Sequence, residues 1–516
     1  MTRPVALTRD KGWYRERNSL AFQVLRVRKA RRTHVSNKAK NTPVRYRITK
    51  RTVPARLKET LQPALLPLAA GEQGAHSHHN GVAKLNGGFA DSAFADNKQR
   101  PVHRWVPWIA GFSSEFVRDA FTRYLPGNRP EAAVVLDPFC GVGTTLVEAL
   151  RCGHDAVGFE INPYPALASR AKCEAAAVSP AQLNQYILKF EDYMRAPEAA
   201  GDSASAPEHF RSRIPFFGPR AEAKVLKALR FINRLRVPPI HDLFELAFGS
   251  VMVNVSNYSY EPSLSSRPAV GKPTQDDAPV AESIVVKLLA MKSDVAWFRE
   301  ELERLPRQPI GRVIQDNFLN ALHHLDPGSV DLIVTSPPYL NNYHYVRNTR
   351  PQLFWLGFVR KPSELKRLEI ENFGKYWQTV RDLEKVALDF EHPALERLLA
   401  QMRGVSVERG TYGGPGWANY AASYFNDMNR FCRVVGQVLK RDGRAVIVVG
   451  NSILQGVEIA VDNILSDLAA RHGLTTENIH IVRQKRVGAS IVSSSVRQGA
   501  RTTAKLYESA VVLRRT

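Results

Sequence analysis

Apolar runs and amphipathic stretches alternate along the middle of the chain. Residues 133–136 form a short apolar run, a turn that contains glycine follows, and residues 146–150 have helical character. Residues 156–160 predict the next strand, residues 312–316 a third, and residues 330–334 a fourth that comes after a short helical stretch. Strands that alternate with helices in this way are typical of a parallel sheet in a doubly wound α/β fold.

The C-terminal part of the chain continues this pattern. Apolar residues recur at helical spacing over residues 424–439, a turn is expected at residues 441–443, and residues 445–451 predict a buried strand. Residues 506–513 predict a last strand, which pairs with residues 478–482. Together these elements predict a mostly parallel sheet of seven strands, with helices on both faces and a ligand at the carboxyl ends of the strands.

A glycine turn links the first predicted strand to its helix. Residues 137–145 read Asp-Pro-Phe-Cys-Gly-Val-Gly-Thr-Thr. Gly141 and Gly143 allow the backbone to approach a ligand, and a helix that begins directly after them offers unpaired N–H groups to a carboxylate. Glu160 ends the second strand 23 residues after Asp137, where doubly wound folds bind ribose hydroxyls. The third glycine of a dinucleotide fingerprint is missing, which argues against NAD.

A second loop, residues 335–339, follows the fourth strand and reads Thr-Ser-Pro-Pro-Tyr. Its prolines fix φ in two consecutive residues and remove two backbone donors, so the carbonyl groups of Ser336 and Pro337 are free to accept hydrogen bonds. Tyr339 supplies a flat apolar face beside them. A base that has been flipped out of a duplex needs both a stacking partner and polar contacts to its edge.

Both loops resemble motifs of one enzyme family. Ser336-Pro337-Pro338-Tyr339 resembles the catalytic motif of the amino-methylating DNA methyltransferases, which use S-adenosylmethionine to modify N4 of cytosine or N6 of adenine. The glycine turn resembles the motif that cradles the methionine half of S-adenosylmethionine in the same family. The resemblance implies a Rossmann-like methyltransferase sheet, S-adenosylmethionine as the cofactor, and catalytic roles for Ser336, Pro337, Pro338 and Tyr339.

The resemblance also implies a set of cofactor contacts. Asp316, at the end of the third strand, is expected to face the adenine ring, with a helix N-cap as the alternative. Residues 111–117 resemble the helical segment that closes over the methionine end. Phe112 and Phe116 are four residues apart, so the alternative is that both are core residues on one helix face. The expected cofactor-binding residues are Phe112, Asp137, Pro138, Phe139, Gly141, Gly143, Thr144, Thr145, Glu160, Asn162 and Asp316.

The first residue of the catalytic motif bears on the target base. In the family, Ser at this position goes mainly with cytosine and Asp or Asn mainly with adenine, so cytosine N4 is the expected target and adenine N6 the first alternative. An RNA guanine-N2 methyltransferase and a non-catalytic DNA-binding protein with this fold are further alternatives. Methylation of cytosine C5 needs a cysteine nucleophile, typically in a Pro-Cys dipeptide, and the sequence contains none.

Composition limits the remaining possibilities. With 516 residues, of which 44% are hydrophobic, the chain is too long for one sheet domain without insertions. Its four cysteines show no Cys-x-x-Cys spacing, and no metal site is expected. No run of about 18 apolar residues occurs, and no apolar stretch follows the Arg-rich first residues, so we expect a cytoplasmic protein without a membrane partner.

The net charge of +23 is concentrated near the N-terminus. Residues 1–60 contain 18 Lys and Arg against 3 Asp and Glu, which gives +15 and leaves +8 for the rest of the chain. We expect this basic N-terminal arm to bind DNA phosphates without reading sequence; an unstructured tail or translation from an upstream start codon is the alternative. Residues 61–100, rich in Gly, Ala, Asn and His, are an expected linker.

The other boundaries follow from the two motifs. Residues 101–175 are the expected cofactor-binding half, residues 306–345 hold the third and fourth strands with the catalytic loop, and residues 421–516 complete the sheet. Two helical insertions, residues 176–305 and 346–420, separate these parts. We expect one or both to read the target sequence, with a cap over the cofactor as the alternative for the first.

Double-stranded DNA is the expected partner. Asn342, Tyr343 and Arg347 follow the catalytic loop and are candidates for contact with the flipped nucleotide or its phosphates. Enzymes of the family usually work beside a restriction endonuclease, so a cognate endonuclease in a restriction-modification system is a further expected partner. The glycine turn precedes the catalytic loop, whereas many N4-cytosine enzymes have the reverse order, so the resemblance does not place the recognition region.

Overall fold

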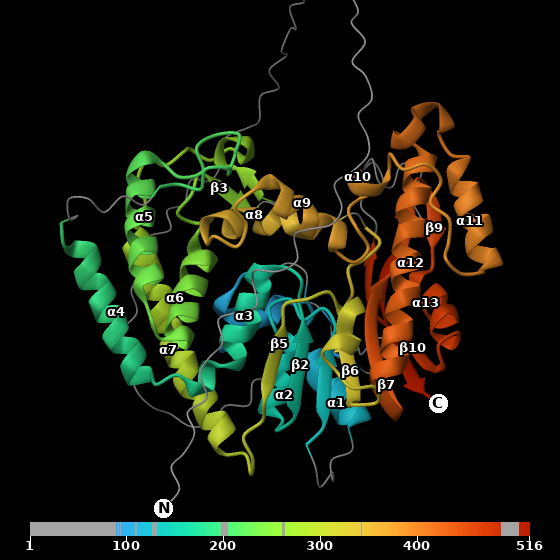
Figure 1. Ribbon diagram of the computed structural model, residues 1–516, viewed down its shortest axis with the longest axis horizontal. Helices are drawn as coiled ribbons and strands as arrows, with labels where there is room; N and C mark the ends of the chain where they lie inside the picture. Colours follow the sequence, from blue (N-terminus) through green and yellow to red (C-terminus); the bar gives the residue numbers. More distant parts are fainter. Residues whose placement is uncertain are drawn as a thin grey trace, which may run out of the picture. The chain divides into compact units, whose positions relative to one another are not determined.

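Seven strands form the central sheet of the computed structural model (Figure 1). In spatial order they are β10 (Leu474–Arg486), β11 (Lys505–Arg515), β7 (Leu439–Gly450), β6 (Val330–Thr335), β1 (Val134–Asp137), β2 (Asp155–Phe159) and β5 (Gly311–Ile314). The five strands from β7 to β5 are parallel, whereas β11 is antiparallel to β7 and β10 is antiparallel to β11. The predicted mostly parallel sheet of seven strands is confirmed.

The structure describes residues 89–516 except 91, 93, 109–110, 126–131, 198–204, 261–263, 342 and 487–504. The basic arm, most of the expected linker, and Asn342 therefore lie outside the described residues. Among the helices of the described part, none is both long enough and apolar enough to cross a membrane.

Alternate residues of the strands enter two different cores. One core includes the helices α1 (Ser114–Tyr124), α2 (Thr144–Arg151) and α3 (Pro163–Cys173), and the other includes α12 (Gly414–Val438) and α13 (Val461–Ala470). Leu332 and Val334 of β6 pack into the first core, and Ile333 between them packs into the second. Because helices cover both faces, β6 is buried along its whole length, which explains its nearly continuous apolar sequence.

Two helical insertions interrupt the sheet. The first holds α4 (Pro180–Arg195), α5 (Pro219–Arg234), α6 (Pro238–Val251), α7 (Val280–Glu303) and a hairpin of β3 (Tyr258–Tyr260) and β4 (Leu264–Ser266). The second holds α8 (Tyr345–Trp355), α9 (Pro362–Glu371), α10 (Trp377–Val380) and α11 (Pro393–Arg403). Figure 1 shows α8 and α9 above the carboxyl ends of the parallel strands.

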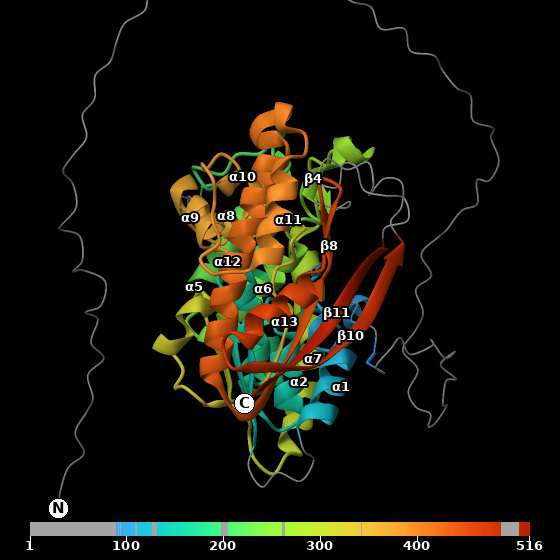
Figure 2. The ribbon, with the colours of Figure 1, turned by 90° about the vertical axis from the view of Figure 1, so that its right-hand side faces the viewer.

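A long antiparallel ribbon forms one edge of the sheet. Figure 2 shows β10 and β11 side by side with α13 packed along them. A small hairpin of β8 (Ser452–Leu454) and β9 (Val457–Ile459) connects β7 to α13. The ribbon brings residues from the end of the chain next to the loop that follows β6.

The expected linker at residues 61–100 extends too far. Phe89, Ser92 and Asn97 are buried, and Phe94–Lys98 form a 3-10 helix. Asn97 Nδ2 donates to the Phe112 carbonyl at 3.1 Å, and its Oδ1 accepts from the N–H of Ser114 at 3.0 Å. This segment is thus tied to the start of α1 by a side chain, an anchor that its polar composition does not reveal.

Two predicted helix boundaries are also wrong. The helix expected within residues 111–117 begins only at Ser114, because the Ser113 hydroxyl caps it by accepting from the N–H of Phe116. Phe112 therefore precedes the helix and does not share a helix face with Phe116. In the C-terminal half, α12 begins at Gly414 rather than at residue 424.

The turn expected at residues 441–443 is an irregularity inside β7. The strand begins at Leu439, directly after α12, and Asp442 has a φ of 62°. The register with β6 changes between Val330 and Leu332, whose partners are Leu439 and Arg444. The polar Arg-Asp-Gly sequence thus marks a distortion of the strand instead of a break.

Candidate active site

A cavity of about 300 Å³ lies at the carboxyl ends of the parallel strands. Pro138, Glu160, Asp316 and Ser336, which follow β1, β2, β5 and β6, all line it. This is the edge at which doubly wound sheets bind ligands. The expected site residues that line this cavity are Phe112, Pro138, Phe139, Gly141, Glu160, Asn162, Asp316, Ser336, Pro338, Tyr339 and Tyr343.

The other expected site residues lie elsewhere. Asp137 and Thr144 line a smaller cavity of about 20 Å³, which shares several lining residues with the larger one. Gly143, Thr145 in the first turn of α2, and Pro337 are buried and line neither cavity. Arg347 is exposed on α8, outside both cavities, and Asn342 lies outside the described residues.

Two glycines shape the turn between β1 and α2. Gly141 has a φ of 51° and Gly143 a φ of 84°, values that side chains rarely adopt. A Cβ on Gly143 would lie 3.0 Å from Ser169 Oγ, and one on Gly141 would lie 3.4 Å from Trp108 Nε1. Ser169 Oγ also donates to the Gly141 carbonyl at 2.7 Å. The turn is therefore packed between α3 and Trp108, and its path requires glycine.

Glu160 joins the end of β2 to this turn. Its Oε2 accepts from the N–H of Gly141 at 3.1 Å, and its Oε1 accepts from the N–H of Asn162 at 2.8 Å. Burial raises the pKa of Glu160 to about 7, although these backbone hydrogen bonds act in the opposite direction. A ligand that donates hydrogen bonds to the carboxylate would favour its ionised form.

Asp137 and Thr145 tie the glycine turn to β6. Asp137 Oδ1 accepts from Thr335 Oγ1 at 2.6 Å and from the N–H of Phe139 at 3.1 Å. Thr145 Oγ1 donates to the Val334 carbonyl at 3.2 Å. Burial raises the pKa of Asp137 to about 6. These side chains connect the glycine turn to the end of β6, so they fix the position of the two loops relative to each other.

The loop after β6 has a fixed geometry. The Tyr339 hydroxyl and Ser336 are joined by a hydrogen bond, and the backbone of Tyr339 hydrogen-bonds the hydroxyl of Tyr345. A Cβ on Gly450 of β7 would lie 3.1 Å from the Tyr339 ring, so the ring rests on a strand position that has no side chain. Burial raises the pKa of Tyr339 above its usual range. Tyr339 is therefore neutral and held from three directions.

Asp316 follows β5 and has three hydrogen-bond partners. Its carboxylate accepts from the N–H of Asn317 at 2.7 Å and from Asn320 Nδ2 at 3.0 Å, and it lies 2.8 Å from His324 Nε2. Burial alone would raise its pKa, but these hydrogen bonds lower it. The N-cap of the following 3-10 helix, Phe318–His323, is Asn317, so the N-cap alternative for Asp316 is wrong.

Several residues that line the cavity were not predicted. Tyr345 lies close to the catalytic loop in sequence, and this nearness could have predicted its place in the site. Residues next to predicted ones, such as Ile161 and Asn341, also line the cavity. A third group comes from segments that no local pattern connects to the site: Ser92, Trp108, Leu368, Asn372, Phe373, Arg483 and Glu508.

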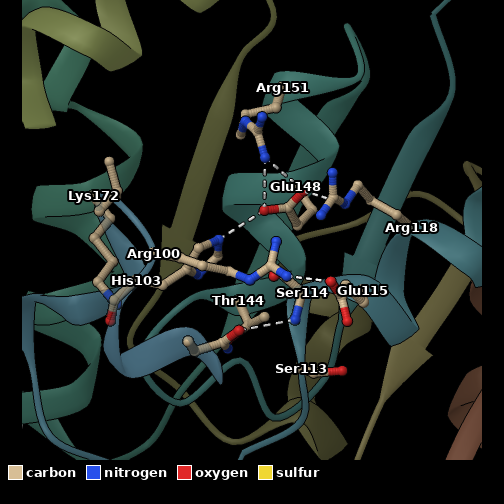
Figure 3. Close-up of polar contacts among 12 residues, drawn as sticks. Arg100, His103, Ser113, Ser114, Glu115, Arg118, Thr144, Glu148, Arg151 and Lys172 are labelled. Carbon is tan, nitrogen blue, oxygen red and sulfur yellow. Dashed lines mark hydrogen bonds and ion pairs between the residues drawn. The ribbon is translucent and has the colours of Figure 1, made fainter. Parts of the chain in front are cut away.

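A buried polar network supports the glycine turn from behind (Figure 3). Glu148 of α2 is fully buried, and its carboxylate hydrogen-bonds His103 at 2.7 Å. Arg151 and Arg118 add ion pairs to the same carboxylate at 3.1 and 3.4 Å. The pKa of Glu148 is lowered because these partners outweigh the effect of burial. The network fixes α2, and hence the helix N-terminus at the turn.

Lys172 of α3 reaches the turn itself. Its side chain is fully buried, and its Nζ donates to the carbonyl of Val142, between the two glycines, at 2.7 Å. Burial lowers the pKa of Lys172 to about 7. The backbone of the turn is thus held by a side chain that never reaches the cavity surface.

Comparison with known proteins identifies this arrangement. A family model described as DNA methylase, N6_N4_Mtase, matches residues 123–169, which include β1, the glycine turn, α2 and β2. The type II methyltransferase M.BsoBI of Geobacillus stearothermophilus is 23% identical over 439 residues, which cover 77% of this chain and 83% of the relative. The family model and the type II relatives support an amino-methylating DNA methyltransferase family for this chain.

Other relatives of this DNA methyltransferase have similar coverage. The type II methyltransferase M.AvaI of Nostoc sp. is 23% identical over 76% of this chain and 82% of its own length, and M.MvaI of Kocuria varians is 22% identical over 73% and 83%. Among solved structures, the rRNA methyltransferase aviRa of Streptomyces viridochromogenes is similar at a TM-score of 0.29 and 11% identity, over 82% of this chain and 92% of that protein.

S-adenosylmethionine is the cofactor of this methyltransferase. The cavity fits such a group on its own features. Its lining combines a glycine turn that a Cβ would crowd, a carboxylate at the end of β2 and a second carboxylate after β5. Aromatic side chains, among them Phe112 and Phe139, complete the same wall.

Proposed function

We propose that this DNA methyltransferase modifies the exocyclic amine of a flipped base, with cytosine N4 as the preferred target, as part of a type II restriction-modification system. The position of Ser336 carries the proposal: it stands first in the catalytic motif and lines the same cavity as the glycine turn and Glu160. The relatives named type II methyltransferases support the restriction-modification context.

The proposed cofactor contacts divide by chemistry. Glu160 would accept hydrogen bonds from the ribose hydroxyls, and Asp316 would face the adenine ring. The glycine turn and the N-terminus of α2 would hold the methionine end, with Phe112 over it. The bound cofactor supplies a methyl group activated on a sulfonium.

Ser336 and Pro337 are proposed to orient the target amine. The amine lone pair is delocalised into the ring and is a poor nucleophile. Hydrogen bonds from the amine to Ser336 Oγ and to the Pro337 carbonyl would favour a more tetrahedral nitrogen and direct its lone pair toward the cofactor side of the cavity. Tyr339 would stack on the base. Because Tyr339 is already fixed by Ser336 and Tyr345, the stacking surface is formed before DNA binds.

The second insertion is the proposed sequence-reading element. Leu368, Asn372 and Phe373 from this insertion line the cavity. By contrast, the described part of the first insertion, residues 176–305, contributes no residue to the lining. Its Tyr260 hydroxyl instead donates to the Asn348 carbonyl of α8 at 2.8 Å, so it supports α8 from outside.

Two further contacts to DNA are proposed beside the catalytic loop. Tyr343 lines the cavity, and its hydroxyl hydrogen-bonds the side chain of Asn348. Arg347 is exposed on α8, where a phosphate has access to it.

Methyl transfer to DNA tests the proposal directly. The purified protein is incubated with methyl-tritiated S-adenosylmethionine and unmethylated genomic DNA, which is then digested to nucleosides and separated by chromatography. We expect label in N4-methylcytosine, and the Ser336→Ala variant should lose transfer by about a hundredfold while it still binds the cofactor. Label in N6-methyladenine would show that Ser336 does not select cytosine, and label only in RNA would reject DNA as the substrate.

The restriction-modification context needs a separate test. Sequencing of the methylated DNA gives the modified site, and DNA modified by the enzyme is then exposed to an endonuclease that cleaves that site. Resistance to cleavage is the expected result. Complete cleavage of fully modified DNA would contradict a protective role.

A further inference from the structure

A row of paired residues crosses three strands on one face of the sheet. Arg483 of β10 pairs with Glu508 of β11, and Glu508 pairs with Gly450 of β7. Residues directly paired in antiparallel strands carry their side chains on the same face. Gly450 has no side chain, and the Tyr339 ring occupies the space above it. The row therefore runs from Arg483 to the catalytic loop.

A bulge in β10 places Arg483 in this row. Ile481 pairs with Ser509 and Arg483 pairs with Glu508, so β10 contains one extra residue at this point. Ser509 faces the opposite side of the sheet, toward α13. Without the bulge, Arg483 would lie opposite Tyr507 and would also face α13. The bulge instead directs Arg483 into the cavity, where it is a lining residue.

Arg483 differs in charge from the other ionisable side chains that line the cavity. Among the described residues that line it, Arg483 is the only Lys or Arg, whereas Glu160, Asp316 and Glu508 are carboxylates. A flipped nucleotide brings its flanking phosphates toward the mouth of the site. An anionic strand that approaches three carboxylates needs a cation beside its path. Arg483 is the lining side chain that can supply it.

The guanidinium of Arg483 remains available to a ligand. Its Nη1 lies 3.9 Å from Glu508 Oε1, which is too far for a hydrogen bond, and it makes no hydrogen bond to any other described residue. About a third of its side chain, 33%, is exposed. Glu508 is itself fixed, because Ser92 Oγ donates to its Oε2 at 3.0 Å. Glu508 thus positions Arg483 but leaves its donors unoccupied.

We propose that Arg483 binds a phosphate of the target DNA strand next to the flipped nucleotide. The inference rests on the proposed function. A phosphate suits the guanidinium because its oxygens accept two parallel N–H hydrogen bonds. The carboxylate of the cofactor is the other anion that enters this cavity. Arg483 lies beside Tyr339, on the side of the catalytic loop, and the glycine turn is the proposed site for that carboxylate.

Salt-dependent DNA binding tests this role. The affinity for an unmethylated duplex that contains the site modified by the enzyme is measured by fluorescence anisotropy. S-adenosylhomocysteine is present, and the measurement is repeated at several NaCl concentrations. Arg483→Ala should raise Kd about tenfold, as expected for loss of a hydrogen bond to a charged group. The slope of log Kd against log salt should fall by about 0.9, the value for one phosphate contact. Arg483→Lys should keep the slope and recover part of the affinity.

Arg514→Ala is the matched control. Arg514 belongs to the same ribbon and has a similar exposure of 38%, but it pairs with Asp442 and Glu477 and does not line the cavity. Its replacement should change neither Kd nor slope. Arg483→Gln replaces the alanine variant if thermal unfolding shows that Arg483→Ala does not fold.

Two results would overturn the assignment. An unchanged salt slope in a folded Arg483→Ala protein would show that Arg483 does not contact a phosphate. A loss of S-adenosylmethionine affinity by calorimetry, with DNA affinity unchanged, would assign Arg483 to the cofactor carboxylate. If the wild-type enzyme methylates DNA and the Arg483→Ala variant is equally active and equally salt-dependent, only this inference is rejected. If the wild-type protein methylates no DNA, the proposed function is rejected as well.

Discussion

The two ends of the cavity are built in different ways. The proposed cofactor end is formed mainly by consecutive elements, from Asp137 to Asn162, with Phe112 and Asp316 added from outside them, and the family model matches the consecutive part. The target end joins Ser336 and Tyr339 to segments that lie far away in the sequence, including Phe373 and Arg483. We propose that a local motif holds the cofactor, while segments remote from one another in the sequence contact the target base.

The largest expected effect is at the cofactor end. Gly143→Val places a branched side chain at a φ of 84° and a Cβ 3.0 Å from Ser169 Oγ, so the turn must move. We expect cofactor binding and methyl transfer to fall below detection, measured by calorimetry and by tritium incorporation. Gly473→Val is the control, because Gly473 also has a positive φ, 72°, but open space around it. If Gly143→Val still binds the cofactor, the glycine turn is not part of the cofactor site.

A substitution at the target end should separate the two functions. Tyr339→Ala removes the proposed stacking surface, and stacking of a base on an aromatic ring is worth about 1–3 kcal/mol, so transfer should fall roughly tenfold to a hundredfold. Cofactor affinity should stay unchanged. Tyr339→Phe keeps the ring, loses the hydrogen bond to Ser336, and should have a smaller effect. Transfer at the wild-type rate by Tyr339→Ala would contradict the stacking role.

The difference between the two ends also explains what the sequence could predict. The seven strands, the glycine turn and the Ser-Pro-Pro-Tyr loop follow from local apolar patterns and short motifs, because their residues are adjacent in the chain. The placement of Arg483 depends on a one-residue bulge and on its pairing with β11, and neither leaves a local signal. The buried anchor Asn97 was hidden for the same reason, since its partners, Phe112 and Ser114, belong to another segment.

The cofactor end should show a dependence on pH. Burial raises the pKa of Glu160 from 4.5 to about 7, so the folded protein binds the extra proton between these values and its stability falls as pH rises through that window. In the proposed complex, the ribose hydroxyls donate hydrogen bonds to the ionised Glu160 carboxylate. Cofactor affinity should therefore increase with pH up to about 7, by at most about tenfold per pH unit, and level off above it.

Calorimetry across this pH range checks the Glu160 prediction. Glu160→Gln should bind the cofactor more weakly and lose this part of the pH dependence. Asp137, whose pKa is raised to about 6, is present in both proteins, and its charge contributes to the raised pKa of Glu160, so the difference between the proteins reports Glu160 together with this interaction. Identical pH profiles would show that Glu160 does not ionise when the cofactor binds.

The smallest expected effect comes from Lys172, behind the glycine turn. Burial lowers its pKa from 10.5 to about 7, so the unfolded chain binds more protons between these values and stability rises with pH there. In Lys172→Met, the stability measured by thermal unfolding should rise less steeply with pH.

The same substitution also removes the hydrogen bond to the Val142 carbonyl, worth about 1 kcal/mol, and should weaken cofactor binding by about fivefold or less. Lys227→Met, which removes a lysine bonded to the Met194 carbonyl in the first insertion, should leave cofactor affinity unchanged. Since Lys172 contacts the glycine turn and the His103 carbonyl behind it, its replacement should not alter the affinity for DNA, and a change in DNA affinity would show that the two ends are coupled.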